Sequence, residues 1–78
     1  MLYIYVLKSA VDDTLYIGQT NNLEKRLKQH NAGQTASNRR KLPYRLVYFE
    51  KANNRLEART IEKRFKSGYM RKSFKKLS

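Results

Sequence analysis

The sequence predicts one small α/β (α+β) domain in which helices pack on a small, mainly antiparallel sheet, in the order ββαβαα. Three observations support this. Short runs rich in β-branched and aromatic residues occur at 3–7, 15–17 and 44–50. Segments with helical spacing and capping residues follow the second and third runs. A length of 78 residues suits a single domain spanning 1–78, with one small core.

The first two runs are expected to form a hairpin. Residues 3–7 show little alternation of polar and apolar side chains, so both faces of this strand should be covered. Asp12 and Asp13 mark a turn, and the second strand, 15–17, ends at Gly18. Two strands so close in sequence pair most simply with each other.

A first helix is predicted over 22–32. Asn21 is its expected N-cap, with Glu24 three positions later in the capping-box place. Gly33 is its expected C-terminal stop. The residues expected to face inward are Leu23 and Leu27.

Two more helices should follow a polar, basic segment at 34–43 and the third strand. Asn53 or Asn54 begins the second helix, and Glu57 takes the capping-box place if Asn54 is the cap. A short basic helix is predicted over 70–77. The inward-facing residues of these two helices should be Ala58, Ile61, Phe65, Phe74 and Leu77.

The charge balance points to a polyanionic partner. Lys and Arg number 18 against 6 Asp and Glu, a net charge of +12, and self-repulsion of that size opposes compactness. Nucleic acid is the first candidate and an anionic membrane surface the second, while the solvated surface of an ordinary basic protein is the structural alternative. The basic residues expected to contact nucleic acid are Lys25, Lys28, Arg39, Arg40, Lys41, Lys63, Lys66, Arg71 and Lys72.

Composition also limits the cellular locations and the kinds of functional site that can be expected. The chain has no cysteine, so disulfides and thiolate metal sites are excluded. No apolar stretch approaches the roughly 20 residues that a membrane span needs, and the first residues do not resemble a signal peptide. A soluble cytoplasmic protein is therefore expected. Phosphate-binding glycine loops and Ser-His-Asp triads are missing, and the three glycines are interpreted as breaks between elements.

Four residues are candidates for a shared site. Tyr5 and Tyr16 lie on adjacent hairpin strands, so their hydroxyls could converge on one patch of the sheet. Arg26 and His30 are spaced i, i+4 and share a helix face, where they could hold a phosphate and exchange a proton. Taken singly, each has an ordinary structural explanation: a half-buried tyrosine, a surface arginine, or a histidine near the helix C-terminus.

Acidic residues are few, and two of them lie beside a buried helical stripe. Glu57 and Glu62 flank the stripe of the second helix on opposite sides, and periodicity does not choose between them. A single carboxylate among so many cations suits a hard divalent ion such as Mg²⁺. That ion takes one or two carboxylates and keeps several waters.

The ordered set of motifs resembles the GIY-YIG nuclease superfamily, which includes the nuclease module of the repair enzyme UvrC. Tyr16 follows Tyr5 by eleven positions, and Arg26 follows Tyr16 by ten. The likeness covers nearly the whole chain and is greatest to the short, stand-alone bacterial members. The residues that carry it are Tyr3-Ile4-Tyr5, Tyr16-Ile17-Gly18, Arg26, His30 and Glu62.

This resemblance implies a compact domain with a three-stranded antiparallel sheet flanked by helices. It also implies phosphodiester hydrolysis with one divalent metal, Mg²⁺ or Mn²⁺. It implies that Glu62, and not Glu57, holds the metal. It further implies that the two tyrosines position or deprotonate the attacking water. The scissile phosphate would be held by the guanidinium at position 26, with the histidine assisting a tyrosine. Three departures stand out: Tyr3 where the motif has glycine, Gln19 where the repair enzymes have lysine, and no asparagine after Glu62.

Together these observations favour a structure-selective or weakly specific DNA endonuclease, with a possible place in DNA repair or recombination. RNA is a possible substrate, and a monomer is expected. The alternative is a non-catalytic nucleic-acid-binding module with the same fold. A third hypothesis is a basic protein that binds ribosomes or membrane surfaces.

Overall fold

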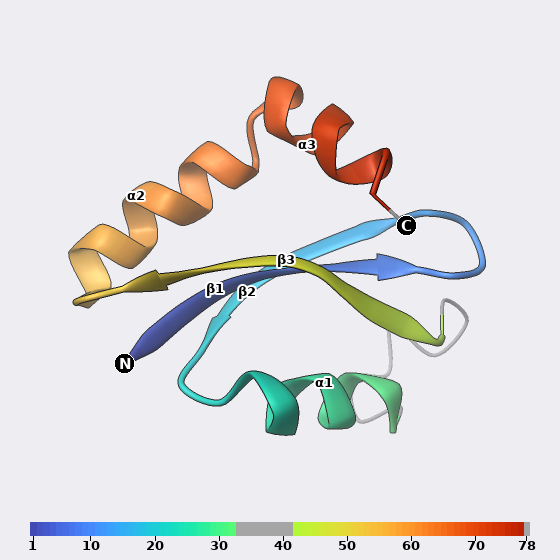
Figure 1. Cartoon of the computed structure of the whole chain (residues 1–78), viewed down its shortest axis with the longest axis horizontal. Coiled ribbons are helices and arrows are strands. Elements are labelled where there is room, and N and C mark those ends of the chain that lie inside the picture. The colour runs from blue at the N-terminus through green and yellow to red at the C-terminus, as the bar shows by residue number, and fades with distance from the viewer. Residues whose placement is uncertain (33–41, 78) are drawn as a thin grey trace.

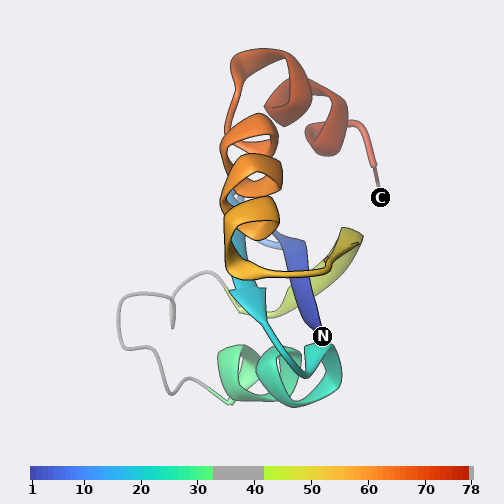
Figure 2. The ribbon, with the colours of Figure 1, turned by 90° about the vertical axis from the view of Figure 1, so that its left-hand side faces the viewer.

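The computed structural model describes residues 1–32 and 42–77, which fold in the predicted order ββαβαα. Helix α1 covers one face of the sheet, and α2 and α3 cover the other (Figures 1 and 2). The elements are β1 (Leu2–Ser9), β2 (Leu15–Thr20), α1 (Leu23–Asn31), β3 (Tyr44–Ala52), α2 (Arg55–Phe65) and α3 (Gly68–Lys75).

The sheet has the strand order β2-β1-β3, and both pairs are antiparallel. The first strand of the chain therefore lies in the middle. Its side chains are buried from Ile4 to Ser9, which explains the missing alternation in the sequence. Tyr5 stands opposite Gly18 on one side and Phe49 on the other. Both β2 and β3 are edge strands.

The hairpin turn uses the two predicted aspartates. Asp13 takes the left-handed backbone conformation, with φ of 63°. The Thr14 amide donates to the Asp12 carboxylate at 3.0 Å, and the Ser9 amide donates to the Thr14 carbonyl at 2.9 Å. A short aspartate side chain that binds backbone nearby tolerates this conformation better than most residues do.

Alternate side chains of β1 enter two separate cores. The core beneath α2 and α3 is aliphatic and aromatic, and the core beneath α1 is largely tyrosine and leucine. The first contains Ile4, Val6, Leu15, Ala52, Ala58, Ile61, Phe65 and Phe74. The second contains Tyr5, Leu7 and Tyr44, with Tyr16, Leu23, Leu27, Leu42 and Leu46 packed against it.

Helix α1 begins one residue later than predicted. Its N-cap is Asn22, not Asn21, and the Asn22 side chain accepts from the Lys25 amide at 3.0 Å. The cause lies in the preceding turn, where the Thr20 hydroxyl accepts from the Asn22 amide at 3.1 Å. Glu24 consequently pairs with Lys28 (3.6 Å), one turn along the helix. The C-cap is Ala32. The predicted stop at position 33 lies outside the described residues.

Asn54 is the N-cap of α2, one of the two predicted alternatives, and its side chain accepts from the Glu57 amide at 2.9 Å. The last helix starts at Gly68, two residues before the predicted start. Phe74 is buried as predicted, but Leu77 is 40% exposed, contrary to prediction. The reason is that α3 ends at Lys75, which leaves Leu77 beyond the helix.

A buried lysine ties the end of α3 to the hairpin. The Lys8 ammonium donates to the Lys75 carbonyl at 2.6 Å and to the Leu77 carbonyl at 2.7 Å. Carbonyls at a helix C-terminus lack partners within the helix and carry partial negative charge, so a cation there is favourable. Asp13 lies 3.7 Å from the same ammonium.

Replacing Phe65 by alanine tests how much of the stability comes from the core beneath α2 and α3. Phe65 is fully buried, and its ring packs edge-on against Phe74 at 5.2 Å between centroids. The cavity left by Phe65→Ala should lower the free energy of unfolding by about 3–5 kcal/mol. Chemical denaturation measures this loss. The control is Leu56→Ala, at a side chain 77% exposed, which should change stability by less than about 0.5 kcal/mol.

Candidate active site

Four of the five predicted catalytic residues converge on the face of the sheet covered by α1. Tyr5 lies on β1, Tyr16 on β2, and Arg26 and His30 on α1. The Tyr5 and Tyr16 rings are stacked, 6.3 Å apart with an interplanar angle of 14°. The His30 ring meets Tyr16 edge-on at 4.5 Å. The structure therefore brings together groups that are 25 residues apart in the sequence.

The Tyr5 hydroxyl is the centre of this cluster. It accepts a hydrogen bond from Arg26 Nε at 3.2 Å and lies 3.3 Å from His30 Nε2. The tyrosine side chain is 2% exposed and the histidine 1%. A buried hydroxyl without partners is costly, so both contacts stabilise the tyrosine where it lies.

Gly18 makes room for that hydroxyl. A Cβ atom at this position would lie 2.6 Å from Tyr5 Oη and 2.8 Å from Cζ, closer than atoms approach without movement. The tyrosine ring therefore crosses β2 where that strand has no side chain. The prediction that all three glycines only separate elements is wrong for Gly18. Its role depends on the strand register, which places it opposite Tyr5.

The protonation states of the cluster follow from its burial. Burial raises the pKa of Tyr5 above its ordinary value, and the hydrogen bond and charge of Arg26 offset part of that rise. Burial also lowers the pKa of His30, and the Arg26 charge lowers it further. Both side chains are therefore neutral at neutral pH. The hydrogen bond to Tyr5 raises the pKa of Arg26, which stays charged.

Neutral His30 can accept a proton from the tyrosine. Because Arg26 Nε donates to the Tyr5 oxygen, the hydroxyl hydrogen is free to point at His30 Nε2. This arrangement requires the imidazole proton to be on Nδ1. That nitrogen is buried, and it has no hydrogen-bond partner among the residues that the structure describes.

Asn31 and Tyr44, which the sequence analysis did not single out, fix the end of α1. The Asn31 carboxamide accepts from the Tyr44 amide at 2.7 Å and donates to the Tyr44 carbonyl at 3.1 Å. The His30 and Tyr44 rings lie 6.1 Å apart. The Asn31 side chain thus binds the backbone at the start of β3 as a neighbouring strand would. It holds the end of α1, which includes His30, next to that strand. No local sequence pattern signals a contact between residues 13 positions apart.

Glu62, the fifth predicted catalytic residue, belongs to the other helical layer. It lies on α2, and its side chain is 26% exposed, with Lys66 Nζ 4.0 Å from the carboxylate. Its negative charge is one of the causes that raise the pKa of Tyr5. None of its hydrogen bonds within the described residues joins it to the four clustered side chains. Glu57 is exposed and lies next to Asn53, with 3.4 Å between its carboxylate and the Asn53 amide.

A polar hollow of about 220 Å³ lies beside Arg26. Its other lining residues come from the end of β2, the following turn and α1, and include Lys25 and Gln19. Gln19, the residue that replaces the lysine of the repair enzymes, therefore lies within reach of any anion held by Arg26. The remaining lining residues are Thr20, Asn21, Asn22 and Gln29.

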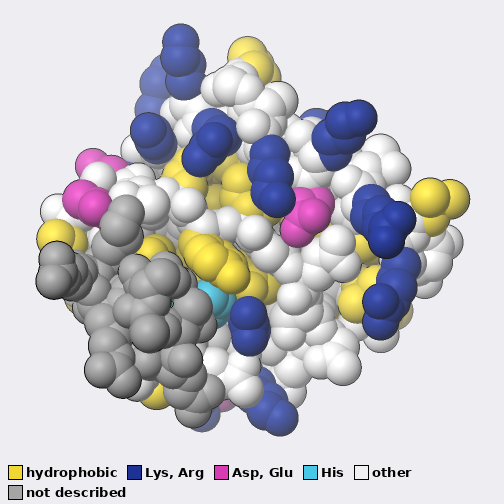
Figure 3. Space-filling view, turned by 180° about the vertical axis from the view of Figure 1, so that it is seen from behind, with side chains coloured by type: hydrophobic (Ala, Val, Ile, Leu, Met, Phe, Trp, Pro, Cys, Tyr) yellow, Lys and Arg dark blue, Asp and Glu magenta, His cyan; other side chains and the backbone are white. Residues whose placement is uncertain are grey.

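The predicted basic residues are divided between the two helical layers. Lys25 and Lys28 are exposed on α1, next to Arg26 in sequence. Four more of the predicted residues are exposed on the opposite layer: Lys63, Lys66, Arg71 and Lys72. Dark blue Lys and Arg side chains are spread over the face shown in Figure 3, with few acidic ones between them. Arg39, Arg40 and Lys41 lie outside the described residues.

The described residues offer limited means of holding a metal. Within 1–32 and 42–77 no group of three or more His, Cys, Asp or Glu side chains could share an ion. The donor chemistry at Glu62 still suits Mg²⁺, since that ion is often held by one carboxylate, waters and substrate oxygens. None of the described helices combines the length and the apolar character needed to cross a lipid bilayer.

Residues 1–76 of this chain match the family of GIY-YIG catalytic domains. The fold, the motif positions and this match agree, and the chain belongs to the GIY-YIG family. Membership supports a nuclease-like function, and nucleases of this family typically depend on a divalent metal.

Individual relatives narrow the comparison to UPF0213 proteins. One, from Clostridium perfringens, is 51% identical over 63 residues, which is 80% of this chain and 67% of the relative. Another, from Pediococcus pentosaceus, is 45% identical over 65 residues, or 82% and 67%. The chain thus spans about two thirds of the length of these relatives. The solution structure of a UPF0213 protein from Bacillus halodurans matches with a TM-score of 0.55 and 30% identity, covering 94% of this chain and 81% of that one.

Adding one methyl group at Gly18 should disrupt the cluster. In Gly18→Ala the buried Tyr5 ring has to move, at an expected cost of about 1–3 kcal/mol in the free energy of unfolding. Denaturation measures this cost, and the shift of His30 ring signals in NMR spectra reports the displaced hydroxyl. The control is Gly68→Ala, where a Cβ meets nothing within 4 Å. Equal stability of the two variants would contradict the steric role of Gly18.

The single histidine allows a direct test of the site's electrostatics. The Cε1 proton of His30 should titrate with a midpoint below the ordinary value of about 6.5. The unfolded chain then binds this proton at a higher pH than the folded chain. Stability contributed by the neutral side chain is complete above that ordinary value and is lost as pH falls through the folded pKa. NMR titration and denaturation as a function of pH measure both effects.

In the variant His30→Asn the loss of stability in this pH range should disappear, because the chain has no other histidine. A midpoint at or above the ordinary histidine value would contradict the burial of a neutral imidazole.

Proposed function

We propose that this protein is a metal-dependent endonuclease that hydrolyses phosphodiester bonds in DNA. The observation that carries the proposal is the buried hydroxyl of Tyr5, held between Arg26 and His30 beside a polar, basic hollow. Family membership supports the same class of chemistry. A tyrosine, an arginine and a neutral histidine in hydrogen-bonding contact can together bind an anion and move a proton.

In this proposal Arg26 holds the scissile phosphate. Its side chain is partly exposed toward the hollow and remains charged, and Lys25 adds a second positive charge there. A guanidinium binds two phosphate oxygens at once, which fixes orientation as well as position. Lys28 and the cations of α2 and α3 then contribute to longer-range attraction, which salt should screen strongly.

The two tyrosines have different tasks because their burial differs. Tyr16 is partly exposed, so its hydroxyl can contact the attacking water. Tyr5 is buried, and its hydroxyl proton moves to His30 Nε2 while Arg26 stabilises the tyrosinate that remains. The tyrosinate then accepts the proton that the attacking water loses. The raised pKa of Tyr5 opposes this transfer in the free protein.

Glu62 is the proposed ligand for Mg²⁺ or Mn²⁺, with waters and phosphate oxygens completing the coordination. The metal supplies polarisation of the phosphate and a more acidic water. Glu62 is paired with Lys66 at 4.0 Å, a weak and half-exposed contact that a divalent ion can displace. Glu57 is less suited because it is exposed and lies beside Asn53.

The net charge of +12 favours nucleic acid over other polyanions as the partner, with DNA preferred and RNA possible. The proposal extends to a cytoplasmic, monomeric protein that does not bind membranes and acts in DNA repair or recombination.

One observation favours a second function, a nucleic-acid-binding module without turnover. Tyr5 and His30 are almost completely buried, and Glu62 is not hydrogen-bonded to either. If the cluster serves only to stabilise the fold beneath α1, the same surface would bind nucleic acid without cutting it.

Cleavage assays on branched and single-stranded DNA with Mg²⁺ or Mn²⁺ separate the two functions. Loss of the metal ligand in Glu62→Gln should lower the rate by about 10²–10³-fold. Glu57→Gln is the matched control, an acid on the same helix whose loss should leave the rate unchanged. Tyr5→Phe should lower the rate by about 10²–10⁴-fold through loss of proton transfer.

Cleavage that is insensitive to chelation, or equal in Glu62→Gln and wild type, would count against the proposed metal site. Steeply salt-dependent binding without cleavage by any divalent metal would support the binding module instead.

A further inference from the structure

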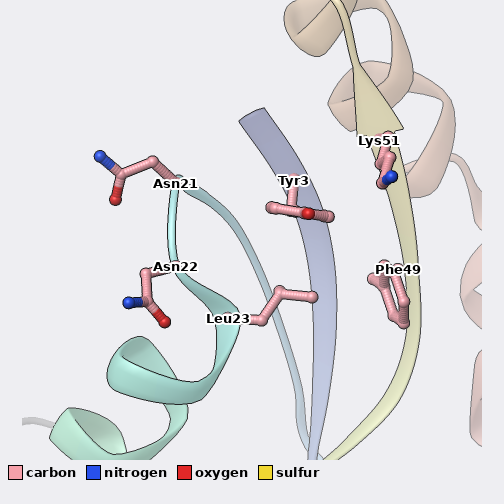
Figure 4. A pocket seen from close by; sticks show the side chains of 6 residues that line it. All are labelled: Tyr3, Asn21, Asn22, Leu23, Phe49 and Lys51. Atoms are coloured by element: carbon pink, nitrogen blue, oxygen red, sulfur yellow. The ribbon is translucent and has the colours of Figure 1, made fainter. Parts of the chain in front are cut away.

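A second hollow, of about 350 Å³, opens next to the polar one, between the start of α1 and the edge strand β3 (Figure 4). Its surface is mostly apolar, with one cation. The lining residues are Tyr3, Asn21, Asn22, Leu23, Phe49 and Lys51. The four clustered side chains of the proposed active site, Tyr5, Tyr16, Arg26 and His30, do not line this hollow, so the two sites are separate.

Two aromatic rings form a corner in this hollow. The Tyr3 and Phe49 rings lie 5.9 Å apart with an interplanar angle of 66°, and Phe49 is 45% exposed. Leu23 extends toward Phe49 across the floor. Exposed ring faces on a strand leave apolar area in water, a cost that is recovered when a flat, apolar group stacks against them.

The aromatic hollow and the hollow beside Arg26 share a wall. Asn21 and Asn22 line both. On β1, Tyr3 lies two residues from Tyr5, or roughly 7 Å along the strand. A nucleotide whose phosphate is bound at Arg26 could therefore place a neighbouring base at Tyr3 and Phe49.

The chemistry of the walls indicates what kind of base would bind. Lys51 is exposed at the rim and can contact a phosphate. The Asn21 side chain extends away from the two rings in Figure 4, and the Asn22 side chain accepts from the Lys25 amide, so neither faces a stacked base with a hydrogen-bonding edge. Recognition by ring stacking and charge tolerates every base, because every base has a π-face.

We propose that this hollow is a binding subsite for one unpaired base of single-stranded DNA, stacked against Phe49 and Tyr3. A base within a duplex is already stacked on both sides, so the subsite selects strands that are single-stranded or frayed near the cut. The position of the neighbouring phosphate rests on the proposed function at Arg26; the stacking itself does not.

The test compares two labelled oligonucleotides of about ten nucleotides. One is oligothymidine, and the other has the same phosphates but abasic sugars. Binding is measured by fluorescence anisotropy in EDTA, where no cleavage occurs. Wild-type protein should bind oligothymidine more tightly. Phe49→Ala should lower the affinity for oligothymidine roughly tenfold and leave the affinity for the abasic strand unchanged.

Two further variants control for folding and for general aromatic contact. Phe49→Leu keeps apolar volume but loses the ring, and it should show the same selective loss. Tyr69→Ala removes an aromatic residue, 80% exposed, from α3 on the opposite helical layer, and it should change neither affinity. Thermal unfolding verifies that each variant is folded.

Equal losses for both oligonucleotides in the Phe49 variants, or no loss for either, would overturn the subsite. The proposed nuclease function fails separately, if metal-dependent cleavage is absent while base-dependent binding persists.

Discussion

Burial of β1 on both faces is the constraint on which the rest of this structure depends. A chain of 78 residues has little interior, and here one strand supplies both cores. Ile4 and Val6 pack beneath α2 and α3, while Tyr5 and Leu7 pack beneath α1. Because the first strand occupies the middle of the sheet, β2 and β3 become edges. The positions of all three helices follow from which face of β1 each must cover.

At one of those buried positions the side chain is Tyr5, which takes part both in the packing of the core and in the candidate site. A hydroxyl taken out of water must be hydrogen-bonded, and Arg26 and His30 meet that requirement. Burial and the charge of Arg26 lower the pKa of His30 and keep it neutral, and the hydrogen bond to Tyr5 raises the pKa of Arg26, which stays charged beside a polar hollow. A cluster that serves the fold therefore also has the components of proton transfer and phosphate binding. Gly18 makes the arrangement possible by leaving space over β2.

The charged residues of the candidate site are divided between the two helical layers. Arg26 and His30 belong to α1, whereas Glu62 belongs to α2 on the far side of the sheet. The Tyr5 hydroxyl lies against Gly18 of edge strand β2 and interacts with both layers. It accepts a hydrogen bond from Arg26 on α1, and the charge of Glu62 on α2 adds to the rise in its pKa that burial causes. A phosphate backbone lying along that edge could contact cations of both layers at once. The aromatic corner at Tyr3 and Phe49 lies between the start of α1 and the other edge strand, β3.

The sequence by itself determined the element order, the family and most of the candidate residues, because each depends on local spacing or on motifs in a fixed order. Helix starts were predicted to within one or two residues. The error at Asn21 arose because the Thr20 hydroxyl accepts from the Asn22 amide, and the error at Leu77 arose because α3 ends at Lys75. Only the tertiary structure decided that Gly18 lies beneath the Tyr5 hydroxyl, that Asn31 binds the backbone of Tyr44, and that Glu62 approaches from the opposite layer. These contacts depend on strand register and on packing between segments distant in sequence, and no local pattern encodes either.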